Sequence, residues 1–221
     1  MLDRERVYFH TRGRDLRRSW PSARQGDFSA EFNASGPPTA SPIAAEGGLY
    51  LAHSYGAIVA TMTHRVRPAG ALVLVEPALY DIARGHEAIE AHITAVESAR
   101  AATGADPLWE YWQRIRPFMF GGPADPLVWN DERVEAEAFF RRRVPWNHHI
   151  TLRELANVPL LVVTGSWNAE YEEIASRLAR NGARHEVLEG HQHRPMDHPR
   201  FAELVDNFAA ALSEARSGHD Y

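Results

Sequence analysis

The chain has 221 residues, of which 44% are hydrophobic and 24% charged, and its formal net charge is −5. This composition is ordinary for a globular protein with one substantial domain, and it offers no electrostatic footprint for nucleic acid or a membrane surface. The absence of cysteine excludes disulfides, thiolate nucleophiles and Cys-ligated metals, and the absence of lysine excludes lysine-based mechanisms. The first residues (MLDRERVYF) do not resemble a secretion signal and no apolar run reaches transmembrane length, so we expect a cytoplasmic protein.

The N-terminal part contains one strand candidate followed by a long irregular segment. Residues 6–10 (RVYFH) are a short β-type run that leads into Arg12-Gly13-Arg14. Residues 19–48 are rich in Ser, Pro, Ala and Gly, and the sequence GPP at 36–38 would break a helix. We therefore expect a long loop here, with at most short helical pieces around residues 28–32.

A strand, a sharp turn and a helix are predicted around Ser54. Residues 49–52 (LYLA) read as a short buried strand, and the small residues at 57–60 begin a helix. This is the context of a nucleophile elbow, in which a strained turn holds a serine hydroxyl at the C-terminal end of a strand. Ala52 stands where G-x-S-x-G has its first glycine. The alternative is a buried turn with an incidental serine, and the rest of the chain favours the nucleophile.

The middle of the chain predicts one buried strand and then helices. Residues 71–75 (ALVLV) form the continuous apolar run of a parallel strand covered on both faces, ended by Glu76-Pro77. Apolar residues at helical spacing predict a helix over 81–101, and further helices are expected at 107–120 and 132–140. The last two carry seven aromatic residues, which indicate either an apolar acyl or alkyl pocket or plain core packing.

The C-terminal part continues the alternation of strands and helices. Residues 158–164 (VPLLVVT) are the clearest strand, residues 171–180 a helix, residues 184–188 a last short strand and residues 200–215 an amphipathic helix. This order predicts an α/β fold with a mostly parallel central sheet flanked by helices. No Gly-rich phosphate loop or dinucleotide fingerprint is present.

The order and spacing of these motifs resemble those of α/β-hydrolases from about Arg6 to Ala215, most strongly at 49–77 and 158–213. The resemblance implies a core at 1–80 and 151–221 and a helical lid at 81–150, with Trp109, Trp112 and Phe118 as substrate-binding candidates. It also implies hydrolysis of an ester, thioester, lactone or amide of a small, largely apolar molecule through an acyl-enzyme on Ser54, without a cofactor.

A serine hydroxyl needs a histidine to take its proton and an acid to orient that histidine. In this family the histidine follows the last strand, and Gly190-His191-Gln192-His193 resembles the G-x-G-H loop, which places His193 in the catalytic position. His191 is the alternative, and both could be solvated histidines in a chain that has twelve.

The acid has three candidates. The usual position after the strand that ends at Thr164 is occupied by Asn168, whose amide cannot stabilise an imidazolium ion by charge. Some relatives take the acid from the end of the preceding strand, which here is Glu76. Glu170 is the third candidate. We choose Glu76, although a structural role for it as a helix cap or an arginine partner is nearly as well supported.

One oxyanion donor is predicted to be the backbone N–H of Tyr55, the residue after the nucleophile. For residues 6–10 two placements compete. In the first, they are the strand before the loop that supplies the second oxyanion donor, and His10-Thr11 is a poor match to the H-G of that loop. In the second, they are the next strand, and Arg12-Gly13-Arg14 resembles the R-G-x-G turn that follows it. The 42 positions between Arg12 and Ser54 favour the next strand. The donor loop would then be missing, and the open sheet edge would predict low stability or a homodimer.

Parts of the sequence are compatible with two other functions. The set His191, His193, Asp197 and His198 resembles the zinc motif H-x-H-x-D-H of metallo-β-lactamase-like hydrolases, but its spacing is two residues too long. From another class of function, the chain could be a non-catalytic remnant of the α/β-hydrolase fold or a small-molecule binder, as Asn168 and a missing donor strand would suggest. A first strand with a loop N–H near Ser54 would favour the enzyme, and an open sheet edge there would favour the remnant.

Overall fold

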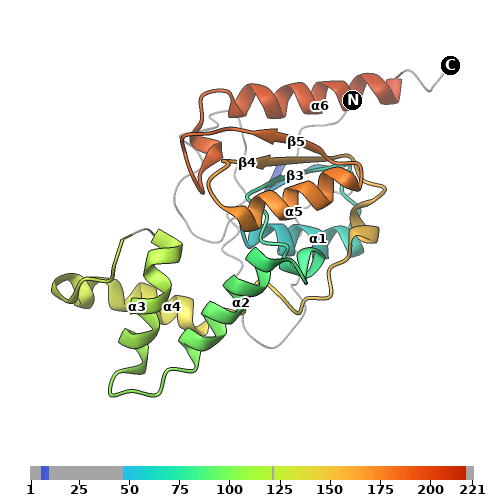
Figure 1. Cartoon of the computed structure of the whole chain (residues 1–221). Helices are drawn as coiled ribbons and strands as arrows, with labels where there is room; N and C mark the ends of the chain where they lie inside the picture. The colour runs from blue at the N-terminus through green and yellow to red at the C-terminus, as the bar shows by residue number, and fades with distance from the viewer. Residues whose placement is uncertain (1–5, 10–46, 121, 218–221) are drawn as a thin grey trace. The chain divides into compact units, whose positions relative to one another are not determined.

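The structure, a computed structural model, describes residues 6–9, 47–120 and 122–217 (Figure 1). The chain divides into two compact units, Met1–Ala83 with Pro145–Tyr221, and Arg84–Val144. The expected long loop at 19–48, with its helical pieces around 28–32, lies almost entirely outside the described residues. No helix in the described ranges is long and apolar enough to cross a bilayer.

The first unit contains a parallel sheet, which has five strands within the described residues. In sheet order these are β1 (Arg6–Phe9), β2 (Leu49–His53), β3 (Ala71–Val75), β4 (Leu160–Thr164) and β5 (Arg184–Val187). The apolar runs of β3 and β4 are buried along their whole length, as strands covered on both faces must be. Since all strands are parallel, their C-terminal ends meet at one edge of the sheet. Ser54, Glu76 and Gly165 each directly follow a strand at that edge.

Helices cover both faces of the sheet, which confirms the predicted α/β class. In Figure 1, α6 (Phe201–Ser217) lies on one side and α1 (Gly56–Val66) and α5 (Ala169–Arg180) lie on the other. On the α6 side, Phe201, Val205 and Phe208 share a buried cluster with alternate residues of three central strands. The opposite pleat of the same strands faces α1 and α5, which follows from the two-residue period of a strand. Short 3₁₀ turns, η4 (Leu152–Leu155) and η5 (Pro195–Asp197), complete this unit.

β1 is the neighbour of β2 in the described part of the sheet. It pairs in register with β2, with Phe9 opposite Ala52, so it lies directly beside the strand that carries Ser54. A described strand therefore lies beside the strand that carries Ser54, and the homodimer stays a prediction. The turn at Arg12-Gly13-Arg14 lies outside the described residues.

The second unit is helical. It contains α2 (Glu87–Arg100), α3 (Pro107–Phe120), the 3₁₀ turn η3 (Pro126–Val128) and α4 (Trp129–Arg141). The helix expected over 81–101 is interrupted at Gly85, which has φ +85°. The residues before Gly85 form a separate 3₁₀ turn, η2 (Tyr80–Ala83). The unit is also shorter than the 81–150 expected. Asp81 accepts backbone N–H bonds from Asn147, His148 and Ile150, and so ties that segment to the sheet unit.

Replacing Glu132 by Gln should destabilise the helical unit by about 1 kcal/mol at neutral pH, because Glu132 accepts hydrogen bonds from Arg116 and Trp112. The Arg116 bond lowers the pKa of Glu132 from its ordinary 4.5. A carboxyl group whose pKa is lower in the folded protein than in the unfolded chain contributes its full stabilisation of the fold above the unfolded-state pKa. That contribution is lost as the pH falls through the folded-state pKa.

Urea unfolding followed by tryptophan fluorescence measures this effect at neutral pH and well below the ordinary carboxyl pKa. The difference between wild type and Glu132→Gln should shrink toward zero in acid. Glu137→Gln removes an exposed i,i+4 pair with Arg141 and serves as the matched control. An equal loss for both variants would contradict the assignment.

Candidate active site

Ser54 lies on a sharp turn directly after β2. Its φ of 54° is in the left-handed region, which non-glycine residues rarely adopt. Hydrogen bonds hold this backbone in place: Ser54 N–H donates to the Val75 carbonyl (2.9 Å), and the Ser54 carbonyl accepts from Ala57 (3.0 Å) and Ala78 (3.1 Å). Because α1 begins at Gly56, the positive end of a helix starts beside the serine. The backbone is thus arranged as a nucleophile elbow requires.

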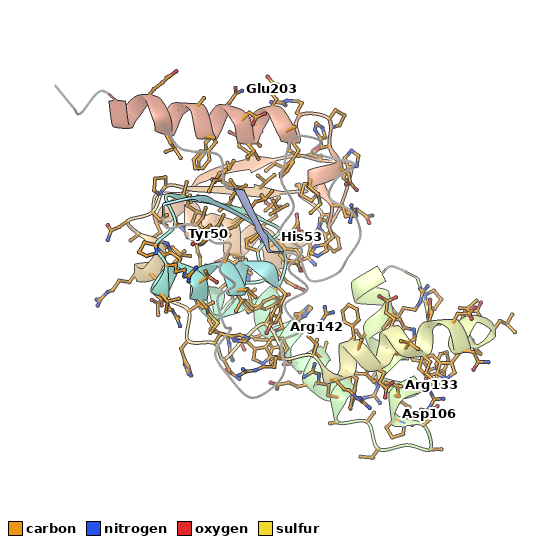
Figure 2. The ribbon with its side chains drawn as sticks, turned by 180° about the vertical axis from the view of Figure 1, so that it is seen from behind. Tyr50, His53, Asp106, Arg133, Arg142 and Glu203 are labelled. Carbon is orange, nitrogen blue, oxygen red and sulfur yellow. The ribbon has the colours of Figure 1, made fainter. Side chains whose placement is uncertain are left out.

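His193 lies in the loop after β5, and its half-buried ring faces Glu76. The distance from His193 Nδ1 to Glu76 Oε2 is 3.6 Å. The His193 ring also lies against the rings of His53, with centroids 4.6 Å apart, and Tyr171, 5.1 Å apart. His53 and Tyr50 are labelled in Figure 2, where both lie along β2. His53 Nε2–H donates to the His193 carbonyl (2.8 Å), so the residue next to Ser54 also holds the histidine loop.

Glu76 is fully buried at the end of β3. Its Oε1 accepts the backbone N–H of Gly165 (2.6 Å), and its Oε2 accepts the indole N–H of Trp167 (2.9 Å). These neutral donors hold the carboxylate without cancelling its charge, so that it can stabilise a cation on His193. The 3.6 Å separation is longer than a hydrogen bond, as catalytic pairs often are before substrate binds.

Gly165 allows the histidine loop to approach this edge of the sheet. A Cβ at this position would lie 2.3 Å from the Gln192 carbonyl oxygen, a clash with backbone that no side-chain movement relieves. Gly165 thus brings together the loop that carries His193 and the N–H that holds Glu76.

The other two acid candidates have different partners. Asn168 is the N-cap of α5, and its Oδ1 accepts the backbone N–H of Glu170 (2.8 Å). Glu170 Oε2 accepts the Tyr80 hydroxyl (2.5 Å). Of the three expected candidates, Glu76 is therefore the one that the structure places against His193.

Tyr55, the predicted oxyanion donor, is the N-cap residue of α1. Its backbone N–H belongs to the turn at the positive end of the helix, where partial positive charge favours an anion. Its side chain is buried, and its hydroxyl lies 3.3 Å from His148 Nε2.

The predicted substrate-binding residues lie in α3 of the helical unit. Trp112 is 1% exposed and its indole donates to Glu132 (2.6 Å), so this ring packs within the helical unit, and its substrate-binding role stays a prediction. Trp109 is half-buried against Trp129, with ring centroids 4.9 Å apart. The Phe118 side chain lies outside the described part of the structure.

The zinc-like set does not form a cluster. Asp197 pairs with Arg194 (2.6 Å), and His191 and His198 meet edge to face with ring centroids 5.6 Å apart. Across the described ranges, no group of three or more His, Cys, Asp or Glu residues is arranged to hold a metal ion.

Sequence reasoning missed three residues that contact the site: His53, Trp167 and Tyr171. A signal for Tyr171 was present, because it shares the inward face of α5 with Ile174 and Leu178, at the end of the helix next to the strand edge. No comparable pattern marks Trp167, whose indole meets Glu76 across 91 positions of sequence.

Three comparisons relate the chain to known proteins. The model of the "Alpha/beta hydrolase family" matches residues 4–204. A comparison with curated proteins found no match. Similar solved structures include one from work on carboxylesterases of the thaumarchaeon Nitrososphaera gargenis. It has 14% sequence identity and a TM-score of 0.43, and the match covers 76% of this chain and 66% of that chain. Another is naproxen esterase from Bacillus subtilis, with 14% identity, coverage of 75% of this chain and 61% of that chain, and a TM-score of 0.46. A third is an alpha/beta hydrolase from Sphaerobacter thermophilus, with 17% identity, coverage of 78% of this chain and 70% of that chain, and a TM-score of 0.48. The chain thus spans under two thirds of the length of the first two.

Proposed function

Because the chain belongs to the alpha/beta hydrolase family, we propose that it is a serine hydrolase that cleaves a carboxylic ester, or a related thioester, lactone or amide. The observation that carries this proposal is the left-handed backbone of Ser54 at φ 54° on a strand-turn-helix. It is supported by His193 and the buried Glu76, which lie 3.6 Å apart at the same sheet edge. The pairing of β1 with β2 adds support, because an open edge there would favour a non-catalytic remnant.

In the proposed reaction the Ser54 hydroxyl oxygen attacks the substrate carbonyl while His193 takes the hydroxyl proton. The Tyr55 N–H stabilises the oxyanion that forms. The bond to the leaving alcohol breaks as His193 returns the proton to it, which leaves an acyl group on Ser54. Water, deprotonated by His193, then attacks the acyl carbonyl. The bond to Ser54 breaks as His193 returns that proton to the serine oxygen, and the acid is released. Glu76 orients the imidazole and stabilises its cation in both steps. No cofactor is required.

The proposed substrate is a small molecule with a largely apolar acyl or alkyl group. This rests on the aromatic residues of 107–140, of which Trp109 keeps a half-buried side chain. Neither nucleic acid nor a membrane surface is proposed as a partner, since the chain carries a net charge of −5 without a basic run.

Labelling with a fluorophosphonate tests the proposal. We expect one adduct by intact mass on folded wild-type protein, located by peptide mapping to the segment with Ser54, and none on unfolded protein. His193→Ala should slow labelling at least roughly tenfold, because the serine loses its base. His191→Ala, two residues away and exposed, is the matched control and should label like the wild type. Folded wild type that does not label would contradict the proposal and favour a non-catalytic, small-molecule-binding role.

A further inference from the structure

Three consecutive residues of the turn after β4 donate hydrogen bonds to carboxylates. The backbone N–H of Gly165 donates to Glu76 Oε1 (2.6 Å). The backbone N–H of Ser166, which has a left-handed φ of 55°, donates to Glu172 Oε1 (3.0 Å). The indole N–H of Trp167 donates to Glu76 Oε2 (2.9 Å). These bonds fix the turn, and the turn fixes where the Trp167 ring lies.

The Trp167 side chain reaches from the solvent to the buried acid. Trp167 is 36% exposed, whereas Glu76, which accepts its N–H, is fully buried. An aromatic ring with a third of its surface in water does not serve mainly to fill a core, so its N–H needs another explanation. The ring also meets the His193 ring edge to face, with centroids 5.8 Å apart and an angle of 68° between the planes. One side chain thus contacts both the acid and the base of the proposed triad.

The other side of the same carboxylate oxygen faces His193. His193 Nδ1 is buried, and among the described residues it has no hydrogen-bond partner. The acceptor in front of it is Glu76 Oε2, at 3.6 Å. A carboxylate oxygen has two lone pairs, so Oε2 can accept from His193 while it keeps the indole N–H. Because a normal N–H···O distance is about 2.9 Å, a shift of roughly 0.7 Å would complete this pair.

We propose that Trp167 is a positioning residue, whose indole N–H fixes Glu76 Oε2 at the place where His193 Nδ1–H reaches it. With Gly165 bound to the other oxygen, the carboxylate cannot turn without breaking hydrogen bonds to a charged group. As positive charge develops on His193, an acceptor that is already oriented stabilises it without reorganising. This inference rests on the proposed hydrolase function.

Trp167→Phe tests the inference, because it removes the N–H and keeps an aromatic ring beside His193. We expect kcat for an ester to fall at least roughly tenfold, the lower end for a hydrogen bond to a charged group. KM should stay unchanged, because Trp167 acts on the acid and not on the substrate. Trp167→Leu, which lacks the ring as well, should lose about as much kcat as Trp167→Phe, since the N–H is the group that acts.

A double variant shows whether the effect passes through Glu76. In a Glu76→Gln background, Trp167→Phe should lower kcat no further, because the charge that the indole positions is already gone. A purely structural effect of the ring would lower kcat by the same factor in both backgrounds. Trp146→Phe removes a buried indole of the same unit, which lies against Tyr80, and is the control that should keep wild-type kcat.

The outcomes separate this inference from the proposed function. If the wild type neither labels with fluorophosphonate nor hydrolyses esters, the proposed function fails, and the positioning role fails with it. If the wild type is active and Trp167→Phe keeps its kcat, or if the two substitutions act independently, the positioning role alone is overturned. A rise in KM with kcat unchanged would overturn it in favour of substrate binding by the exposed ring. A fall in melting temperature with both constants unchanged would assign the indole bond to structure alone.

Discussion

Replacing Ser54 by Ala should lower kcat/KM for an ester by roughly 10⁴–10⁶-fold, because the acyl-enzyme route is lost and only binding and oxyanion stabilisation remain. The fold should survive the change. The strain of the left-handed backbone is borne by Ser54 already, and alanine at φ 54° meets the same strain without losing a backbone hydrogen bond. Steady-state kinetics on short-chain esters, with circular dichroism on the same samples, measure both.

Ser166 offers a matched control. It follows β4 at the same edge of the sheet, and its φ of 55° is nearly identical. It is exposed, and its backbone N–H donates to Glu172. Ser166→Ala should therefore keep the wild-type rate. Equal activity in the wild type and Ser54→Ala would show that the strained turn at Ser54 has no nucleophile.

The parts of this structure that the sequence predicted well are those dictated by local pattern. The apolar runs of β2, β3 and β4 have the length and composition of strands buried on both faces, and Pro107–Phe120 is helical as expected. The elbow was recognisable because its chemistry is confined to adjacent residues. The helix expected at 81–101 is interrupted at Gly85, whose positive φ separates the 3₁₀ turn η2 from the helix α2.

What the sequence could not settle depends on contacts between distant segments. The choice among Glu76, Asn168 and Glu170 required knowing that Asn168 caps its own helix and that Glu170 meets Tyr80. The position of β1 depended on strand pairing, which a short β-type run does not encode. The role of Trp112 could not be read from composition, because an aromatic side chain has the same apolar character in a core as in a pocket.

Replacing Glu76 by Gln should lower kcat by roughly 10³–10⁴-fold with little change in KM, because a neutral amide cannot stabilise the imidazolium that forms on His193. Gln has the size of Glu, so the buried site stays filled. Its one carbonyl oxygen can replace only one of the two acceptors that Gly165 and Trp167 use, so a modest loss of stability should accompany the change.

The rival acids are tested by the same substitution elsewhere. Glu170→Gln should cost no more than roughly tenfold in kcat, since the Glu170 carboxylate accepts the hydroxyl of Tyr80. Asn168→Asp keeps the N-cap acceptor of α5, so it should leave kcat of the wild type unchanged. If Asn168→Asp restored activity to Glu76→Gln, the acid position after β4 would still be functional. If instead Glu170→Gln gave the larger loss, Glu76 would be a structural carboxylate, held by Gly165 and Trp167 to shape the turn after β3.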